Sequence, residues 1–411
     1  MAAILDTNEQ VTLSGQPFSL SFHPTQPLFT CGTVGGALET HSTTGSTTLK
    51  SKVQLYNATV RHAKYDPSGD SIYAVGGNGS VSCIAAATGA TTWTASPNSN
   101  SINKLHLASG GNTGGLLLAG YDTGVIAAFD PRTSTKVGEL TCHSDYISSF
   151  LQVSEHQTVA TSGDGTLSCW DLRKVSGPVK GAALKQAHPA LVKRSDELED
   201  ELLSSCLIKH GKKVVCGTQG GTLNIWSTGT WGDFGDRFPG HPESVECVLK
   251  VDEETVITGS SDGLLRVVQL LPNKLLGVLG DHEGFPVEGL EWGAGGTIGS
   301  YSHDEVVRLW DGGVFTDDGE GEAEAEAGEA VDVVETMREK GVGLAGAGSD
   351  DEWEDMDEED EEDDEEGGEK MDGIDEGDSD DSDMDDDDEE GGGGKKFAKL
   401  QTPNEAFFED L

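Results

Sequence analysis

The residues of this chain best equipped for chemistry are a histidine, a serine and an aspartate that occur in order late in the sequence. His282 is followed by Ser300 and Asp304, and Trp310 closes the set. An aspartate that orients a histidine, which in turn activates a serine, forms the catalytic triad of many hydrolases. The same residue types also form buried hydrogen-bonded networks that hold a turn in place. In the first interpretation the serine is exposed to a substrate, and in the second it is buried in the protein core.

The set recurs along the chain, and recurrence favours the structural interpretation. Two partial copies precede it, one made of His241, Thr258 and Asp262 and the other of His143, Asp164 and Trp170. A hydrolase needs a single nucleophile on an exposed turn, with its own base and oxyanion hole. A network that supports a repeated structural unit appears once in each unit instead. We therefore predict that these residues are structural, that the chain has no catalytic residues and that it is not an enzyme.

The histidine sets lie within a longer repeat. In each copy a small or acidic residue, often followed by glycine, precedes a short apolar stretch that ends in a bulky residue. The bulky residues are His41, Ile84, Phe129, Trp170, Trp226, Val268 and Trp310, at intervals of 43, 45, 41, 56, 42 and 42 residues. Five of the six intervals match the length of one four-stranded blade of a β-propeller. We predict an all-β fold, a seven-bladed β-propeller formed by residues 1–316.

The seventh blade lacks an outer strand after its own bulky residue. Beyond Trp310 the chain becomes rich in glycine and then in glutamate and alanine, which does not favour a strand. Residues 10–13 lie just before the first inner strand expected, at 18–22. We expect residues 10–13 to pair with the seventh blade and to remove its exposed edge. Residues 331–334 are the alternative for this strand.

The charge of the chain is concentrated in one segment. The formal net charge is -47, and residues 317–390 alone carry 39 acidic against 3 basic side chains. Such a composition buries almost nothing, so we expect an acidic, disordered segment over residues 317–394. It argues against direct binding of nucleic acid, which requires clustered cations, and leaves any RNA contact indirect. It suits basic protein partners instead, unless it serves only to keep the protein solvated.

Two further features follow the propeller region. Ser349 and Ser382 are each followed by an acidic residue three positions later, the pattern that acidophilic kinases favour. Residues 395–411 form a basic and aromatic motif that contains Phe407 and Phe408. Aromatic side chains anchor many interfaces, so we expect this motif to dock in a partner or to fold back on the propeller.

Several functional classes find no support in the sequence. The seven cysteines form no Cys-x-x-Cys pair, and we expect reduced thiols in the core. Residues 110–115 are glycine-rich but lack the Lys-Ser or Lys-Thr of a phosphate-binding loop, so no cofactor or metal site is expected. No apolar stretch reaches membrane-spanning length and no signal-peptide pattern begins the sequence, so we expect neither membrane insertion nor secretion.

Two loops depart from the repeat. The interval of 56 residues between the fourth and fifth bulky positions holds an insertion, and residues 188–203 within it favour a short helical turn. The other loop carries Trp231 and Phe234 outside the strand pattern, as a partner site or as a lid on blade five. Long loops on a rigid scaffold commonly carry recognition, although an insertion can also be tolerated without function.

Specific phrases in the second half of the chain resemble the WD repeat-containing protein 55 family and its fungal relatives. They include Leu271-Pro-Asn-Lys274 and Asp281-His-Glu-Gly-Phe-Pro-Val-Glu288, and Phe407-Phe408 resembles the family's tail motif. The chain departs from the pattern at His41 and Ile84, where tryptophan is expected. The resemblance implies a WD40 β-propeller in the nucleus and nucleolus that acts in rRNA synthesis and large-subunit assembly without enzymatic activity. Its partners would be basic ribosomal or pre-ribosomal assembly factors, bound by a monomer within complexes.

Two alternatives from other functional classes remain open. Trp170-Asp171-Leu-Arg173 resembles the Trp-Asp-x-Arg box of substrate receptors for cullin-four ubiquitin ligases, in which the arginine contacts a propeller-shaped adaptor. Such a receptor should lose its adaptor when Arg173 is replaced, whereas an assembly scaffold should not. The acidic segment by itself also suits a histone chaperone, which binding assays with core histones would reveal.

Overall fold

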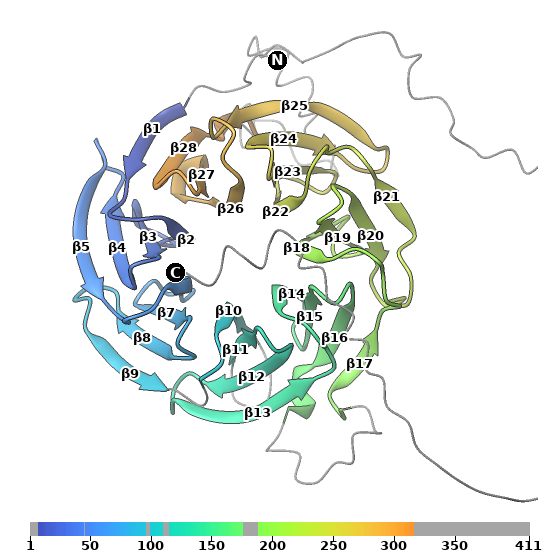
Figure 1. The fold of residues 1–411 in the computed structure, drawn as a ribbon, viewed down its shortest axis with the longest axis horizontal. Coiled ribbons are helices and arrows are strands. Elements are labelled where there is room, and N and C mark those ends of the chain that lie inside the picture. The colour runs from blue at the N-terminus through green and yellow to red at the C-terminus, as the bar shows by residue number, and fades with distance from the viewer. Residues whose placement is uncertain (1–6, 45, 96–98, 110–114, 176–187, 316–411) are drawn as a thin grey trace, which may run out of the picture. The chain divides into compact units, whose positions relative to one another are not determined.

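Seven four-stranded antiparallel sheets form a closed ring (Figure 1). The computed structural model describes residues 7–315 except 45, 96–98, 110–114 and 176–187. The described residues contain 28 strands and three short 3-10 helices. Consecutive innermost strands contact one another, and the last contacts the first, which closes the ring. The predicted seven-bladed β-propeller is therefore confirmed.

Four concentric sets of strands build the ring, with one strand of each set in every blade. The innermost strands are β2 (Pro17–Phe22), β6 (Val60–Tyr65), β10 (Ile102–Ala108), β14 (Ile147–Ser154), β18 (Leu202–Ile208), β22 (Val245–Lys250) and β26 (Val287–Trp292). The second strands are β3 (Leu28–Thr33), β7 (Ser71–Gly76), β11 (Leu116–Tyr121), β15 (Gln157–Ser162), β19 (Lys213–Thr218), β23 (Thr255–Ser260) and β27 (Thr297–Ser302).

The third strands contain the bulky residues that define the repeat. They are β4 (Ala37–Ser42), β8 (Val81–Ala85), β12 (Val125–Asp130), β16 (Leu167–Asp171), β20 (Leu223–Ser227), β24 (Leu264–Gln269) and β28 (Val306–Asp311). The outer strands are β5 (Thr48–Gln54), β9 (Thr91–Ala95), β13 (Thr135–Thr141), β17 (Leu191–Arg194), β21 (Asp236–Phe238), β25 (Lys274–Asp281) and β1 (Thr7–Thr12). All seven bulky residues are at most 4% exposed, so the repeat marks the core positions.

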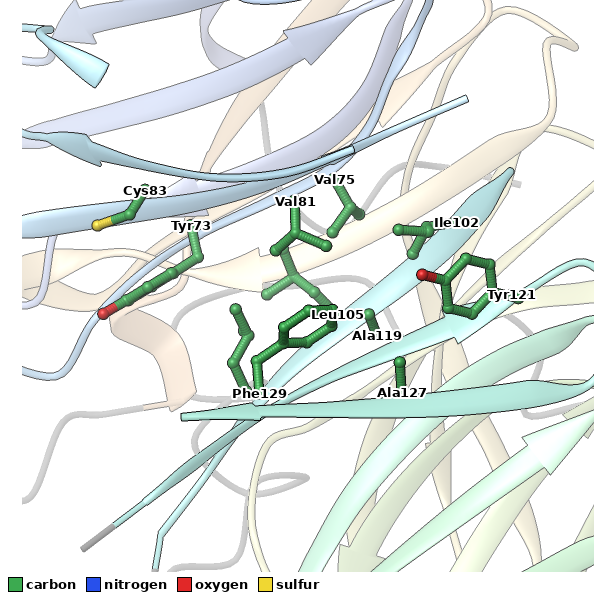
Figure 2. Packing of buried hydrophobic residues seen from close by; sticks show 11 residues of the cluster. Tyr73, Val75, Val81, Cys83, Ile102, Leu105, Ala119, Tyr121, Ala127 and Phe129 are labelled. Carbon is green, nitrogen blue, oxygen red and sulfur yellow. The ribbon is translucent and has the colours of Figure 1, made fainter. Parts of the chain in front are cut away.

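The core is divided among the interfaces between blades. The buried apolar side chains form seven clusters, and each joins one pair of neighbouring blades. Figure 2 shows the cluster between blades two and three, where Val75 and Val81 lie across from Leu105 and Phe129. Each such side chain contributes about 1.5–3 kcal/mol by leaving water. A single blade has no such partner, so every blade depends on its neighbours for stability.

The ring is closed by β1, which contains residues 10–12 of the segment expected there. It runs antiparallel to β28, with Val11 opposite Val307. The Leu13 N–H continues the pairing and donates to the Glu305 carbonyl at 3.0 Å. Val11 and Leu13 also pack in the cluster between blades seven and one. The alternative strand at residues 331–334 lies outside the described residues.

Blades one and two replace the tryptophan of the repeat in different ways. His41 stacks on Phe29 with ring centroids 5.2 Å apart and an interplanar angle of 8°. Burial lowers the pKa of His41, although Glu39 opposes the change from 3.5 Å away. The imidazole of His41 is thus a neutral aromatic ring stacked in the core. Ile84 is fully buried between blades one and two without any polar group.

The structure corrects the expected helical turn between blades four and five, and several other predictions concern residues that it does not describe. Residues 191–194 form β17 where a helical turn was expected, because their backbone pairs with β16. The seven cysteines are free, and all except Cys142 are buried. No helix among the described residues is long and apolar enough to span a bilayer. The acidic segment, Ser349, Ser382, Phe407 and Phe408 lie outside the described residues.

Candidate interaction site

The complete histidine network holds blade seven together. His282 Nδ1 lies 3.0 Å from Asp304 Oδ2, and its Nε2 lies 2.7 Å from Ser300 Oγ. Trp310 Nε1 donates to the same hydroxyl oxygen at 2.8 Å. These contacts link the loop before β26, the strand β27, the turn after it and the end of β28. Four parts of one blade are thereby fixed to one another.

The network has the geometry of a hydrolase triad but not the exposure of one. Ser300 and His282 are both 0% exposed, so no substrate reaches the hydroxyl. The serine oxygen also accepts the Trp310 N–H, while its single proton serves His282. Burial is the largest single influence and raises the pKa of Asp304, but the hydrogen bond and charge of His282, the Val306 N–H and the charge of Arg308 together lower it below its usual value. The aspartate is thus a permanent acceptor within a structural network.

Blade four builds the same network with a serine from a different strand. His143 Nδ1 lies 3.2 Å from Asp164, and Nε2 lies 2.6 Å from Ser168 Oγ. Trp170 Nε1 donates to Ser168 at 2.7 Å. Ser168 lies on β16, opposite Ala160 of β15, whereas Ser300 lies on the second strand of its blade. Sequence reasoning missed Ser168, although a hydroxyl two residues before the tryptophan was the available signal.

Blade six contains only part of the network. His241 Nε2 lies 2.8 Å from Thr258 Oγ1, and its Nδ1 has no hydrogen-bond partner among the described residues. Asp262 instead accepts two hydrogen bonds from Arg266, at 3.0 and 2.5 Å. Burial, followed by the positive charge of Arg266, lowers the pKa of His241 to about 4. The structure therefore brings His241 and Thr258 together but pairs Asp262 with an arginine.

The candidate adaptor-binding arginine forms a fork with its neighbouring aspartate. Arg173 Nε and one terminal nitrogen each lie 2.9 Å from a different oxygen of Asp171. The hydrogen bonds from Arg173 outweigh the effect of burial and lower the pKa of Asp171 to about 2. The Arg173 side chain is 55% exposed, so the fork is presented at the surface in one orientation. This geometry belongs to the turn that ends β16, where the 3-10 helix η1 (Leu172–Lys174) begins.

A second fork of the same design lies in the preceding blade and was not predicted. Arg132 Nε and a terminal nitrogen lie 3.2 and 3.0 Å from the two oxygens of Asp130. Asp130 ends β12 as Asp171 ends β16, and both aspartates also accept the backbone N–H two residues on. The signal was the spacing Asp-x-Arg after an aromatic residue, in this case Phe129. Blades three and four thus present matching arginine forks.

The tryptophan loop of blade five packs inward. Trp231 is buried in the cluster between blades four and five. Phe234 packs edge to face on Trp226, with ring centroids 5.7 Å apart. Trp231 therefore belongs to this cluster, and Phe234 is partly buried against it. Residues 229–233 of the loop line a groove together with Val192 and Lys193.

Among the described residues no group of three or more His, Cys, Asp or Glu side chains is arranged to hold a metal ion. The two arginine forks and the groove beside β17 lie at the surface.

Comparison with known proteins identifies the family. The WDR55 family model matches residues 8–315, which is the whole propeller. The chain belongs to the WDR55 family. The WD repeat-containing protein JIP5 of Coprinopsis cinerea is 34% identical over 319 residues, which cover 74% of each chain. The WD repeat-containing protein 55 of Arabidopsis thaliana is 31% identical and covers 73% of this chain and 82% of its own.

The likeness extends to more distant WDR55 relatives. The WD repeat-containing protein 55 of Rattus norvegicus is 28% identical over 319 residues, covering 75% of this chain and 77% of its own. The resemblance predicted from the sequence is therefore confirmed. As a WD-repeat propeller of the WDR55 family, the protein is a protein-interaction scaffold.

Proposed function

We propose that the protein acts in ribosome biogenesis, in the nucleus and nucleolus, as a non-catalytic scaffold for rRNA synthesis or processing and large-subunit assembly. The observation that carries the proposal is membership of the WDR55 family across the whole propeller. The resemblance to this family implies that role. A rigid ring whose histidine networks are closed to substrate suits a scaffold better than an enzyme.

The acidic segment supports basic assembly factors as the partners. Residues 317–390 hold 39 acidic and only 3 basic side chains. Ribosomal proteins are cationic because they bind RNA phosphates, so a polyanion competes for the same surfaces. The proposed mechanism is that the acidic segment recruits or shields a basic protein while the propeller binds other members of the complex.

The proposal is tested by removing the charge without removing the chain. Residues 317–390 are replaced by a Gly/Ser segment of equal length, and the plain deletion serves as a second variant. Precursor-rRNA processing and co-purified proteins are measured at low and high salt. Loss of basic partners at low salt together with accumulation of precursor rRNA is the expected result, because the attraction is electrostatic. Unchanged partners and unchanged processing would reject the role of the segment.

A second candidate function, substrate receptor for a cullin-four ubiquitin ligase, is favoured by the arginine forks. Arg132 and Arg173 are presented alike at the ends of the third strands of neighbouring blades. Two matching cations on adjacent blades form a larger docking surface than one four-residue box would.

This candidate is separated from the first by arginine substitutions. The double variant Arg132→Ala and Arg173→Ala is compared with Arg237→Ala, an exposed arginine on β21 of blade five. Loss of binding to the purified adaptor in the double variant alone would support the receptor function. An assembly scaffold keeps its rRNA-processing activity in both variants.

A further inference from the structure

The loop between blades six and seven exposes an aromatic side chain. Phe285 lies between β25, the outer strand of blade six, and β26, the inner strand of blade seven (Figure 1). It is 47% exposed and is one of three large apolar side chains on the surface of the described residues. Aromatic side chains anchor many protein interfaces, but a single exposed one is common. The loop around Phe285 therefore decides whether its exposure has a function.

This loop is one residue longer than the matching loops of blades four and six. In those two blades the inner strand begins four residues after the network histidine, whereas in blade seven it begins five residues after it. The pairs are His143 and Ile147, His241 and Val245, and His282 and Val287. The longer loop contains two consecutive residues in the left-handed region, Glu283 and Gly284, with φ of 57° and 86°. The residue just after them is Phe285.

The longer loop leaves a buried hydroxyl without a partner. In blade four, Ser162 donates to the Asp145 carbonyl of the matching loop at 3.0 Å. In blade six, Ser260 donates to the Glu243 carbonyl at 3.4 Å. Ser302 holds the same position at the end of β27 and is 0% exposed, but it has no hydrogen-bond partner among the described residues. Because a buried unpaired hydroxyl is unfavourable, blade seven loses stability by holding this loop, as binding sites often do.

The loop is nevertheless fixed at several points. The buried His282 donates from its backbone N–H to the Gly263 carbonyl at 2.9 Å, and the Phe285 N–H donates to the His282 carbonyl at 3.0 Å. Arg308 is mostly buried and forms an ion pair with Glu283 at 3.0 Å. A side chain on a fixed loop loses little conformational entropy when a partner binds. Phe285 is thus suited to act as an anchor.

Carboxylates surround the loop on this face of blades six and seven. They lie in the loops that join outer to inner and second to third strands, and at the strand ends beside these loops. The eight residues are Glu243, Glu246, Asp262, Asp281, Glu283, Glu288, Asp304 and Glu305. This set is considered together with every cation that contacts it.

The cations at this face are fewer than the carboxylates. Arg266 pairs with Asp262, Arg308 pairs with Glu283 and Asp304, and His303 pairs with Glu288. Lys104 of blade three also acts electrostatically on Glu246 and Glu288. With all four cations charged, the eight carboxylates still leave a net charge of -4. Three exposed carboxylates form no ion pair among the described residues, namely Glu243, Asp281 and Glu305.

The neighbouring blades do not reverse this negative charge. Lys52 of blade one pairs with Glu39, and the exposed Arg237 of blade five is outnumbered by five carboxylates in residues 196–201. Among the described residues, the loops that join outer to inner and second to third strands contain no lysine or arginine. Charge complementarity therefore favours a basic partner over an acidic one.

We propose that Phe285 anchors a basic segment of another protein on this face of blades six and seven. An apolar side chain of the segment packs on the Phe285 ring, and lysines or arginines on both sides of it meet Glu243, Asp281 and Glu305. The aromatic contact gives the site its position, and the carboxylates select the charge of the partner. The site goes beyond the proposed function, because it lies on the propeller and does not use residues 317–390.

The chain offers matched controls for both parts of the site. Phe285→Ser is compared with Leu49→Ser, since Leu49 is 53% exposed on β5 of blade one. Phe285→Tyr keeps the aromatic ring. The double variant Glu243→Lys and Glu305→Lys is compared with Asp70→Lys and Glu155→Lys, two exposed carboxylates in loops of the opposite face. Thermal melts establish that all variants keep the wild-type fold.

The test uses the full-length chain and three labelled ten-residue peptides. One is lysine-rich with two central leucines, the second has serines in place of the leucines, and the third has glutamates in place of the lysines. Each is titrated against the wild type and against the chain whose residues 317–390 are replaced by Gly/Ser, because the acidic segment also attracts lysine. Fluorescence anisotropy follows binding, and amide hydrogen exchange locates it.

The expected result is a site that survives the Gly/Ser replacement. In that chain the lysine and leucine peptide binds at least tenfold more tightly than the other two. Phe285→Ser and the double variant at Glu243 and Glu305 each weaken it at least tenfold, because they remove the anchor and reverse the charge. Phe285→Tyr and the control variants leave it within twofold, and the amides of residues 282–287 gain protection.

Other outcomes overturn the proposal. Equal binding of the serine peptide removes the aromatic anchor, and equal binding of the glutamate peptide removes the charge selection. Losses in the control variants that match those at Phe285 show that the site is not specific, and no binding at 1 mM peptide shows that there is no site. Binding that disappears with the Gly/Ser replacement belongs to the acidic segment. That result leaves the proposed function intact, since rRNA processing in variants of residues 317–390 tests it separately.

Discussion

Blades six and seven differ in how they provide hydrogen-bond partners for the buried polar side chains at the same position. Blade seven has the full set, in which Ser300 satisfies both His282 and Trp310. Blade six has Val268 at the tryptophan position, so its Thr258 hydroxyl meets His241 and donates to the Arg266 carbonyl at 3.4 Å instead of accepting a tryptophan N–H. A buried polar group costs free energy only if it is present and unpaired. Blade six has no tryptophan N–H to satisfy, but its His241 Nδ1 is buried without a partner among the described residues, so its network is incomplete.

The largest expected effect is the removal of the shared hydroxyl. Ser300→Ala leaves two buried nitrogen groups, on His282 and Trp310, without a partner. It should lower the free energy of unfolding by about 3 kcal/mol, since each unsatisfied buried group costs about 1–3 kcal/mol. Thr258→Val leaves one such group and should cost about 1 kcal/mol. Urea unfolding followed by circular dichroism measures both, and equal losses would show that blade seven gains nothing from its complete network.

The next effect is a dependence of stability on pH that arises in blade six. His241 has a pKa near 4 in the folded protein, below the usual value of about 6.5 in an unfolded chain. The unfolded state therefore takes up the proton first, and stability present above pH 6.5 is lost as the pH falls toward 4. The loss from this one group between pH 7 and pH 5 is about 2 kcal/mol. His241→Gln should lose less stability than the wild type over this interval, and parallel pH profiles would contradict the assignment.

A smaller effect separates a tryptophan that has a hydrogen-bond partner from one that has none. Trp310 Nε1 donates to Ser300, whereas Trp226 Nε1 in blade five has no partner among the described residues. Both substitutions to phenylalanine shrink the core similarly, so their difference reports the hydrogen bond. Trp310→Phe should cost about 1 kcal/mol more than Trp226→Phe. Thermal unfolding at one scan rate provides the comparison, and a larger loss for Trp226→Phe would refute it.

The smallest expected change tests why Asp262 avoids the histidine. Arg266→Met removes the cation that holds Asp262 and that helps to lower the pKa of His241. The pKa of His241 should then rise, because the aspartate becomes available to its unpaired Nδ1 and a positive charge is gone. NMR titration of the imidazole signals measures this change. An unmoved pKa would mean that burial alone sets it.

Much of the fold could be predicted because each blade repeats the same local requirements. The spacing of the bulky residues identified all seven third strands, including those with His41, Ile84 and Val268 in place of tryptophan. These substitutions preserve burial even where they change chemistry. The position of a side chain in the repeat therefore predicted the third strands better than the type of residue did.

The networks were predictable only in part, because a hydrogen bond depends on which strand supplies its partner. Ser168 reaches the same point as Ser300 from the neighbouring strand, a displacement that linear spacing does not reveal. Arg266 lies four residues after Asp262 and forms an ion pair with it, so it competes with His241 for the carboxylate. The strand at β17 was also missed, because its charged residues pair through the backbone and show no alternation.

The pairing of β1 with β28 has a consequence for the synthesis of the protein. Residues 7–12 are synthesised well before their partners at 306–310, which follow roughly three hundred residues later. At about 5–20 residues per second the nascent chain carries an unpartnered strand for about 15–60 s. Throughout this interval the incomplete ring exposes the apolar faces of the sheets at its two ends, and they are buried only when the final blade folds. Chaperone demand should therefore peak just before that blade emerges, and a bulky fusion at the first strand should hinder completion of the ring more than one elsewhere.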